Sequence, residues 1–89
     1  MTMAFQPLDE VRVARLAIAT REVDGFTAEP PQPRVGESGT VVEPLGDDLY
    51  LVERATDDGR TLWIAEFHAS ELELLDRPPR DGSADVGTA

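Results

Sequence analysis

The sequence predicts an all-β fold of about five short strands. Two observations lead to this prediction. The stretches Leu49 to Ala55 and Leu62 to Phe67 are rich in branched and aromatic residues, and each divides into two faces at a spacing of two, as strands do. Between them, Asp57 to Gly59 is typical of a hairpin, because Asp and Gly tolerate the positive φ that such turns require.

The start of the chain is compatible with two kinds of secondary structure. Residues 1–7 are expected to form a leader that docks loosely on the domain or not at all. In the segment 9–19, Val11 and Val13 alternate with charged residues as in a strand, whereas Val11 and Ile18 could share one face of a helix. We favour a strand, because Val, Ile and Thr are enriched in strands and the sheet needs a partner for its edge.

The segment Thr20 to Arg34 is predicted to be a long loop. It contains Pro30, Pro31 and Pro33. Proline donates no hydrogen bond to a strand ladder and pushes the preceding residue toward extended geometry, so these residues form a connector of polyproline character. Phe26 is expected to anchor this loop in the core.

The rest of the chain reads as short elements separated by turns. Glycines bracket a tight turn before the second strand, and Ala69 to Glu71 resembles a single helical turn. The predicted strands are 41–44, 49–55, 62–67 and 72–74. After Asp76, the segment 77–89 has one branched aliphatic residue and no aromatic residue, so it is expected to be a disordered tail.

Parity within the strands divides the side chains into a core and an outer face. We expect Trp63 and Phe67 to point into the core beside Val41, Tyr50 and Val52.

The opposite parity then gives an apolar patch with an acidic edge on the outer face. This predicted partner-binding patch consists of Leu49, Leu51, Glu53, Leu62, Ile64 and Glu66. Exposed apolar patches usually mark a binding surface. The alternative is that the long loop or a second copy of the chain, in a homodimer, covers the patch.

Over residues 8–76, these elements describe a small SH3-like barrel with a long loop after the first strand. The segments 36–43, 49–53 and 58–62 resemble DUF4926, a family of small bacterial proteins with G-x-x-G-T-V-V, aromatic-x-V-E and D-G-x-T motifs. The chain departs from that family in a longer loop and at Arg54, where the family commonly has an aromatic residue. The G-T-V-V pattern is similar, more distantly, to nitrile hydratase beta-type subunits and KOW modules. The resemblance implies a non-enzymatic, partner-binding role.

Charge restricts the partner. The chain has 8 basic residues, all of them Arg, against 18 Asp and Glu, and its net charge is −10. This charge repels nucleic-acid phosphate and anionic membranes and favours a basic protein surface. The chain has no Cys for disulfides, and no segment looks like a signal peptide or a membrane span, so a cytoplasmic protein is expected.

No residue pattern indicates catalysis, a cofactor or a metal site. His68 is the single imidazole, and the acidic pairs at 47–48 and 57–58 are explained by their turns. Two hypotheses remain. The first is a protein-interaction module, such as an antitoxin, an immunity protein or an accessory subunit. The alternative is a small barrel subunit or accessory chain of a metalloenzyme of nitrile hydratase type.

Overall fold

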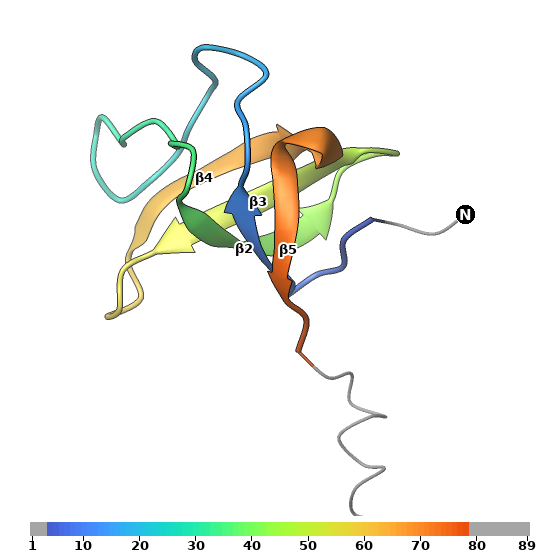
Figure 1. Ribbon diagram of the computed structural model, residues 1–89. Helices are drawn as coiled ribbons and strands as arrows, with labels where there is room; N and C mark the ends of the chain where they lie inside the picture. The colour runs from blue at the N-terminus through green and yellow to red at the C-terminus, as the bar shows by residue number, and fades with distance from the viewer. Residues whose placement is uncertain (1–3, 79–89) are drawn as a thin grey trace, which may run out of the picture.

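The computed structural model describes residues 4–78 and shows five antiparallel strands in one sheet (Figure 1). The order of the strands in the sheet is β4-β3-β2-β1-β5. The elements along the chain are β1 Glu10–Val13, β2 Ser38–Pro44, β3 Leu49–Ala55, β4 Thr61–His68, the 3-10 turn η1 Ala69–Glu71 and β5 Leu72–Asp76. The predicted all-β class is therefore confirmed, together with the single helical turn before the last strand.

The sheet bends so that β1 and β5 cross in front of β2, β3 and β4 (Figure 1). Register shifts interrupt three of the four ladders, between Glu10 and Val11, between Val41 and Glu43, and after Arg54. Such bulges bend a strand and increase its twist. The two edge strands, β4 and β5, are joined through η1 and are not neighbours in the sheet, so closure into a barrel stays a prediction.

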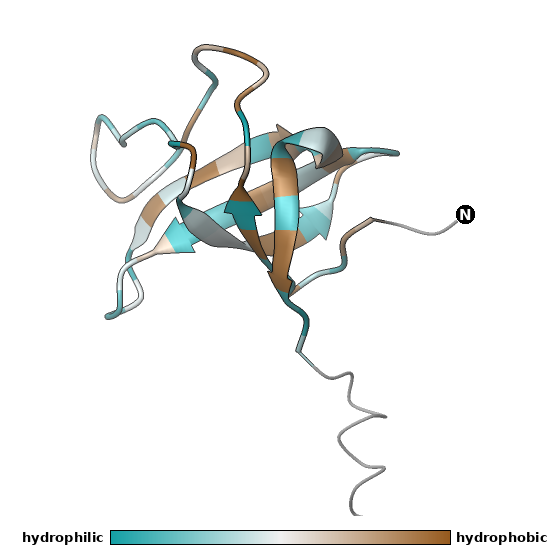
Figure 2. Ribbon diagram, in the orientation of Figure 1, coloured by the Kyte–Doolittle hydropathy of each residue, from teal (hydrophilic) through white to brown (hydrophobic). Residues whose placement is uncertain are grey.

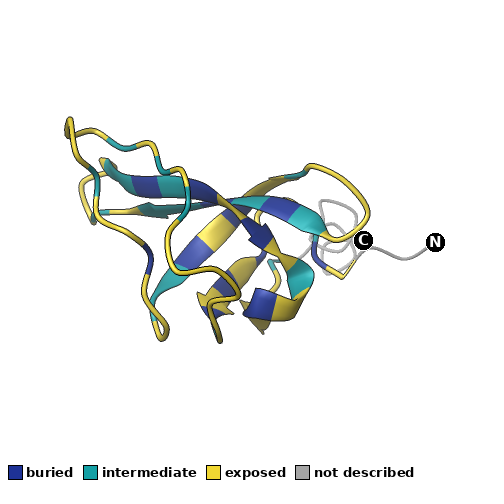
Figure 3. Ribbon diagram, turned by 90° about the horizontal axis from the view of Figure 1, so that it is seen from above, coloured by how far each residue is buried: buried dark blue, intermediate teal, exposed yellow. Residues whose placement is uncertain are grey.

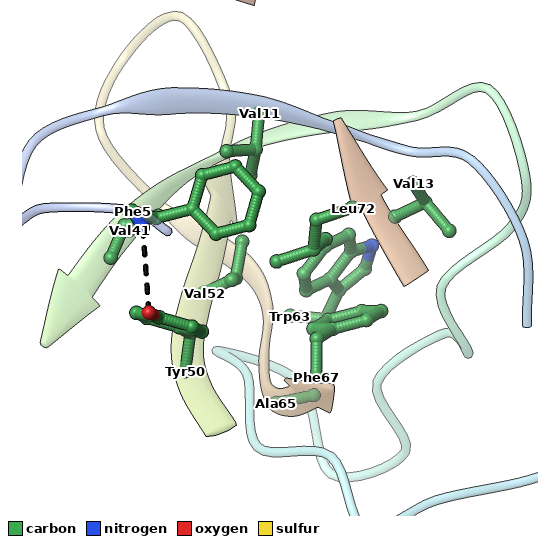
Figure 4. Close-up of a cluster of buried hydrophobic side chains, with 10 residues drawn as sticks. All are labelled: Phe5, Val11, Val13, Val41, Tyr50, Val52, Trp63, Ala65, Phe67 and Leu72. Atoms are coloured by element: carbon green, nitrogen blue, oxygen red, sulfur yellow. Dashed lines mark hydrogen bonds between the residues drawn. The ribbon is translucent and has the colours of Figure 1, made fainter. Parts of the chain in front are cut away.

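The core lies in the space enclosed by this bend (Figure 4). The predicted parity is confirmed, because Val41, Tyr50, Val52, Trp63 and Phe67 are all buried. Figure 2 shows apolar and polar residues alternating along the strands that supply these side chains. Alternation at a spacing of two thus determines which face of β3 and β4 is covered.

The N-terminal segment packs more closely than its sequence indicates. Phe5, placed in the predicted leader, is 7% exposed and belongs to the core. Its ring and the ring of Tyr50 form a T-shaped pair with a centroid distance of 5.3 Å and an interplanar angle of 85°, and the Tyr50 hydroxyl accepts a hydrogen bond from the N–H of Ala4 at 3.1 Å. A single aromatic residue without a periodic pattern around it gives no local signal of burial, which explains the difference.

The last described residues also contact the domain. Arg77, assigned to the predicted tail, donates from Nε to Oδ1 of the buried Asp9 at 2.9 Å and from Nη2 to Oδ2 at 2.8 Å. Arg77 therefore links the end of β5 to Asp9. Residues 79–89, which make up most of the predicted tail, lie outside the described residues.

The first strand is shorter and the following loop is longer than predicted. β1 ends at Val13, and the long loop, defined here as residues 14–37, is mostly exposed (Figure 3), although Pro33 is buried and Arg21 and Val23 are partly buried. Phe26 does not anchor it, since this residue is 52% exposed and its ring faces the guanidinium of Arg60 at 5.7 Å. Other contacts fasten the loop, and they shape the candidate site.

Candidate functional site

The long loop and the outer face of β3 and β4 enclose a groove of about 990 Å³, called the loop groove below. Its floor contains the half-buried side chains of Leu49, Leu51 and Ile64. The loop supplies apolar walls, among them Ile18 and Val23. The outer face of the sheet is thus neither fully free nor fully covered.

A hydrogen-bonded contact between backbones fastens the loop to the edge of β4. The Asp24 N–H donates to the carbonyl oxygen of Ile64 at 3.1 Å, and the Ile64 N–H donates to the carbonyl oxygen of Asp24 at 2.8 Å. Gly25 permits this approach, because a Cβ there would lie 2.6 Å from the carbonyl oxygen of Leu62. Glycine is the residue that allows two backbones to come so close.

A buried ion pair provides the second fastening. The side chains of Arg21 and Glu71 are 6% and 3% exposed, and their Nη2 and Oε2 atoms are 2.5 Å apart. A second bond joins Arg21 Nη1 to Glu71 Oε1 at 3.1 Å. Glu71 also accepts hydrogen bonds from the N–H groups of Ala17 at 2.7 Å and His68 at 2.9 Å. We call this arrangement the Arg21–Glu71 latch.

The latch explains how a charged pair is tolerated at a buried position. Burial alone raises the pKa of the Glu71 carboxyl. The hydrogen bonds from Arg21, Ala17 and His68, together with the charge of Arg21, outweigh burial and lower this pKa to about 2. Glu71 is therefore ionised at neutral pH, and its charge is neutralised by Arg21.

Arg21 also connects the loop to the core and to β4. Its guanidinium lies over the ring of Phe67, 4.4 Å from the centroid, and Nη1 donates to the carbonyl oxygen of Glu66 at 2.8 Å. Its backbone exchanges hydrogen bonds with the side-chain amide of Gln32 across the loop. One residue thus fastens both arms of the loop, since its side chain binds the sheet and its backbone binds Gln32.

The remaining charges of the loop groove are acidic. Glu22, Asp24 and Glu66 line it, and none of the three forms an ion pair with another residue of the described part of the chain. Within residues 4–78, five arginines pair with carboxylates other than these, namely Arg12, Arg21, Arg54, Arg60 and Arg77. The groove therefore combines an aliphatic floor with carboxylates available to a cationic ligand.

Four residues of the predicted partner-binding patch line the loop groove, namely Leu49, Leu51, Ile64 and Glu66.

The other two patch residues lie elsewhere. Glu53 accepts a hydrogen bond from the hydroxyl of Thr61, and Leu62 packs against the core cluster. The loop residues that complete the groove, including Arg21 and Asp24, were missed by sequence reasoning. Glu71 is 50 positions from Arg21, and no local pattern joins residues so far apart.

Within residues 4–78, no group of three His, Cys, Asp or Glu side chains is arranged to hold a metal ion. The same part of the chain contains no helix that is long and apolar enough to cross a membrane. Searches of family models, curated proteins and solved structures find no match to this chain.

Proposed function

We propose that the chain is a non-enzymatic protein-interaction module that binds a basic partner protein through the loop groove. One observation carries the proposal. The groove places the half-buried aliphatic side chains of Leu49, Leu51 and Ile64 beside carboxylates that no described arginine neutralises. Apolar contact area and charge complementarity are the two properties that protein recognition sites combine.

The dimensions of the groove support the same proposal. Its volume of about 990 Å³ is at the upper end of the roughly 300–1,000 Å³ found for ligand sites. This volume accommodates a few side chains of a partner. The net charge of −10 repels a second copy of the chain and attracts a basic surface. Acidic groups should therefore speed the encounter, while the aliphatic floor slows dissociation.

The resemblance to DUF4926 points to the same class of role and stays a proposal. An antitoxin, an immunity protein and an accessory subunit would each use a surface of this kind. The identity of the partner decides among them.

The test begins with capture of partners from an extract of the native host on the full-length chain. Affinities for the purified partner are then measured for the wild type and for the groove variants Leu51→Asp and Glu66→Arg. Leu74→Asp and Glu10→Arg are matched controls, because both residues are exposed and lie outside the groove. We expect only the groove variants to weaken binding, and raised salt to slow association. Equal binding by all four variants, or an acidic partner with salt-insensitive association, refutes the proposal.

A further inference from the structure

The aromatic residues of the strands are not available to a ligand in the loop groove. Tyr50, Trp63 and Phe67 are fully buried in the core (Figure 4), and Arg21 covers the ring of Phe67. Among the described residues that line the groove there is no Phe, Tyr or Trp, and the one aromatic ring is the imidazole of His68. Proline-rich segments bind SH3-type domains through aromatic-lined grooves, so the loop groove lacks the surface that such ligands need.

The edge of β4 offers few free backbone groups to an added strand. Asp24 takes both backbone groups of Ile64, and the carbonyl oxygen of Glu66 accepts from Arg21. At the end of the strand, the N–H of His68 donates to Glu71. Recognition by strand addition depends on a row of unpaired main-chain groups, and here the loop and η1 already bind several of them. A ligand of the groove must be recognised through its side chains.

The surfaces that remain are aliphatic and anionic. Leu49, Leu51 and Ile64 form an apolar floor without a Phe, Tyr or Trp ring, and the carboxylates of Glu66 and Asp24 line the same groove. Glu66 belongs to β4, and Asp24 belongs to the loop segment that is hydrogen-bonded to the edge of this strand. An aliphatic side chain fits the floor, and cations beside it can reach the carboxylates. Guanidinium matches a carboxylate particularly well because it donates two parallel hydrogen bonds.

From these three observations we infer that the ligand is a short extended segment of the partner, in which an aliphatic residue is flanked by Arg or Lys. The inference rests on the proposed function and specifies the chemistry of the partner. It excludes a proline-rich segment and an added β-strand as the mode of binding.

The experiment is a selection of nine-residue peptides from a random displayed library on the immobilised full-length chain, with the Leu51→Asp variant as counter-selection. We expect enrichment of sequences that carry a Leu, Ile or Val next to Arg or Lys. The best peptide, made synthetically, should bind Glu66→Arg on the order of tenfold more weakly and Glu10→Arg unchanged. Circular dichroism and urea midpoints establish that each variant is folded.

Enrichment of proline-rich or acidic sequences overturns the inference. Capture of the enriched peptides by Leu51→Asp as efficiently as by the wild type also overturns it. Failure to enrich any peptide also overturns it, because a short segment is then not sufficient for binding. In that event the proposed function still stands if the purified partner loses affinity for the groove variants. If Leu51→Asp and Glu66→Arg change neither the affinity for the peptide nor the affinity for the partner, both proposals fail.

Discussion

Replacement of Glu71 by Gln tests the energetic role of the Arg21–Glu71 latch. The substitution keeps the shape of the side chain and removes its charge. Because the side chain of Arg21 is only 6% exposed, the variant leaves a guanidinium without its counter-ion in a buried site. Breaking a buried pair in this way typically costs about 3–5 kcal/mol.

The pH dependence of the stability gives a second value for the contribution of the latch to folding. The pKa of Glu71 falls from an ordinary 4.5 to about 2 in the folded chain. At about 1.4 kcal/mol per pKa unit, this lowering stabilises the fold by about 3 kcal/mol at neutral pH. A carboxyl with a lowered pKa contributes fully above its unfolded pKa, and its contribution disappears as the pH falls through the folded value. The loss therefore occurs between about pH 5 and pH 2, and more than half of it has occurred by pH 3.

The assay is urea unfolding of the wild type and Glu71→Gln at a series of pH values from 7 to 3, with an osmolyte present if the variant is marginally stable. The difference in the free energy of unfolding should shrink as the pH falls, because protonated Glu71 resembles Gln. Glu73→Gln is the matched control, since its pair with Arg12 is about half exposed and should contribute no more than about 1 kcal/mol. A difference that stays constant from pH 7 to pH 3 refutes the reasoning on the latch.

Three further substitutions test the core and the loop. Trp63→Ala should reduce the free energy of unfolding by about 3–5 kcal/mol in urea titrations, because this residue is 1% exposed; a loss below about 1 kcal/mol would contradict its place in the core. Phe5→Ala should cost about 3 kcal/mol through loss of the packing on Tyr50, and an unchanged midpoint would mean that the N-terminal segment is not docked in solution. Gly25→Ala should move the loop away from Leu62, so the neighbouring amides should exchange their hydrogens faster. Unchanged hydrogen exchange would show that the close approach is not required.

Local patterns were sufficient to predict the central part of the fold. The bounds of β3 and the single helical turn 69–71 agree with the structure. The buried parity of Trp63 and Phe67 follows from alternation along one strand. Each of these features is determined by residues that are adjacent in sequence.

Features that depend on distant contacts could not be predicted in this way. Phe5 packs on Tyr50, and Arg77 binds Asp9 across 68 positions. The contacts that fasten the long loop could not be predicted for the same reason. Its prolines indicated a connector, but its fastening depends on Arg21, whose partner comes from η1. A charged residue in a polar loop gives no signal that distinguishes burial in an ion pair from exposure.

The same distinction applies to the candidate site. Alternation placed Leu51, Ile64 and Glu66 on one face, which is the floor of the loop groove. The wall comes from the loop, and it converts an apolar face into a groove that carries carboxylates from both the sheet and the loop.

The latch and the backbone contact at Asp24 make this wall part of the folded domain. Both arms of the loop are held at Arg21, which packs over the core residue Phe67, so the groove exists before any ligand arrives. A preformed site does not lose the ordering entropy of its own loop on binding, which leaves more of the contact energy for affinity. Glu71 does not need to touch a partner to affect binding, because it holds the wall in place. Substitutions in the latch should therefore weaken stability and binding together, whereas Glu66→Arg should weaken binding alone.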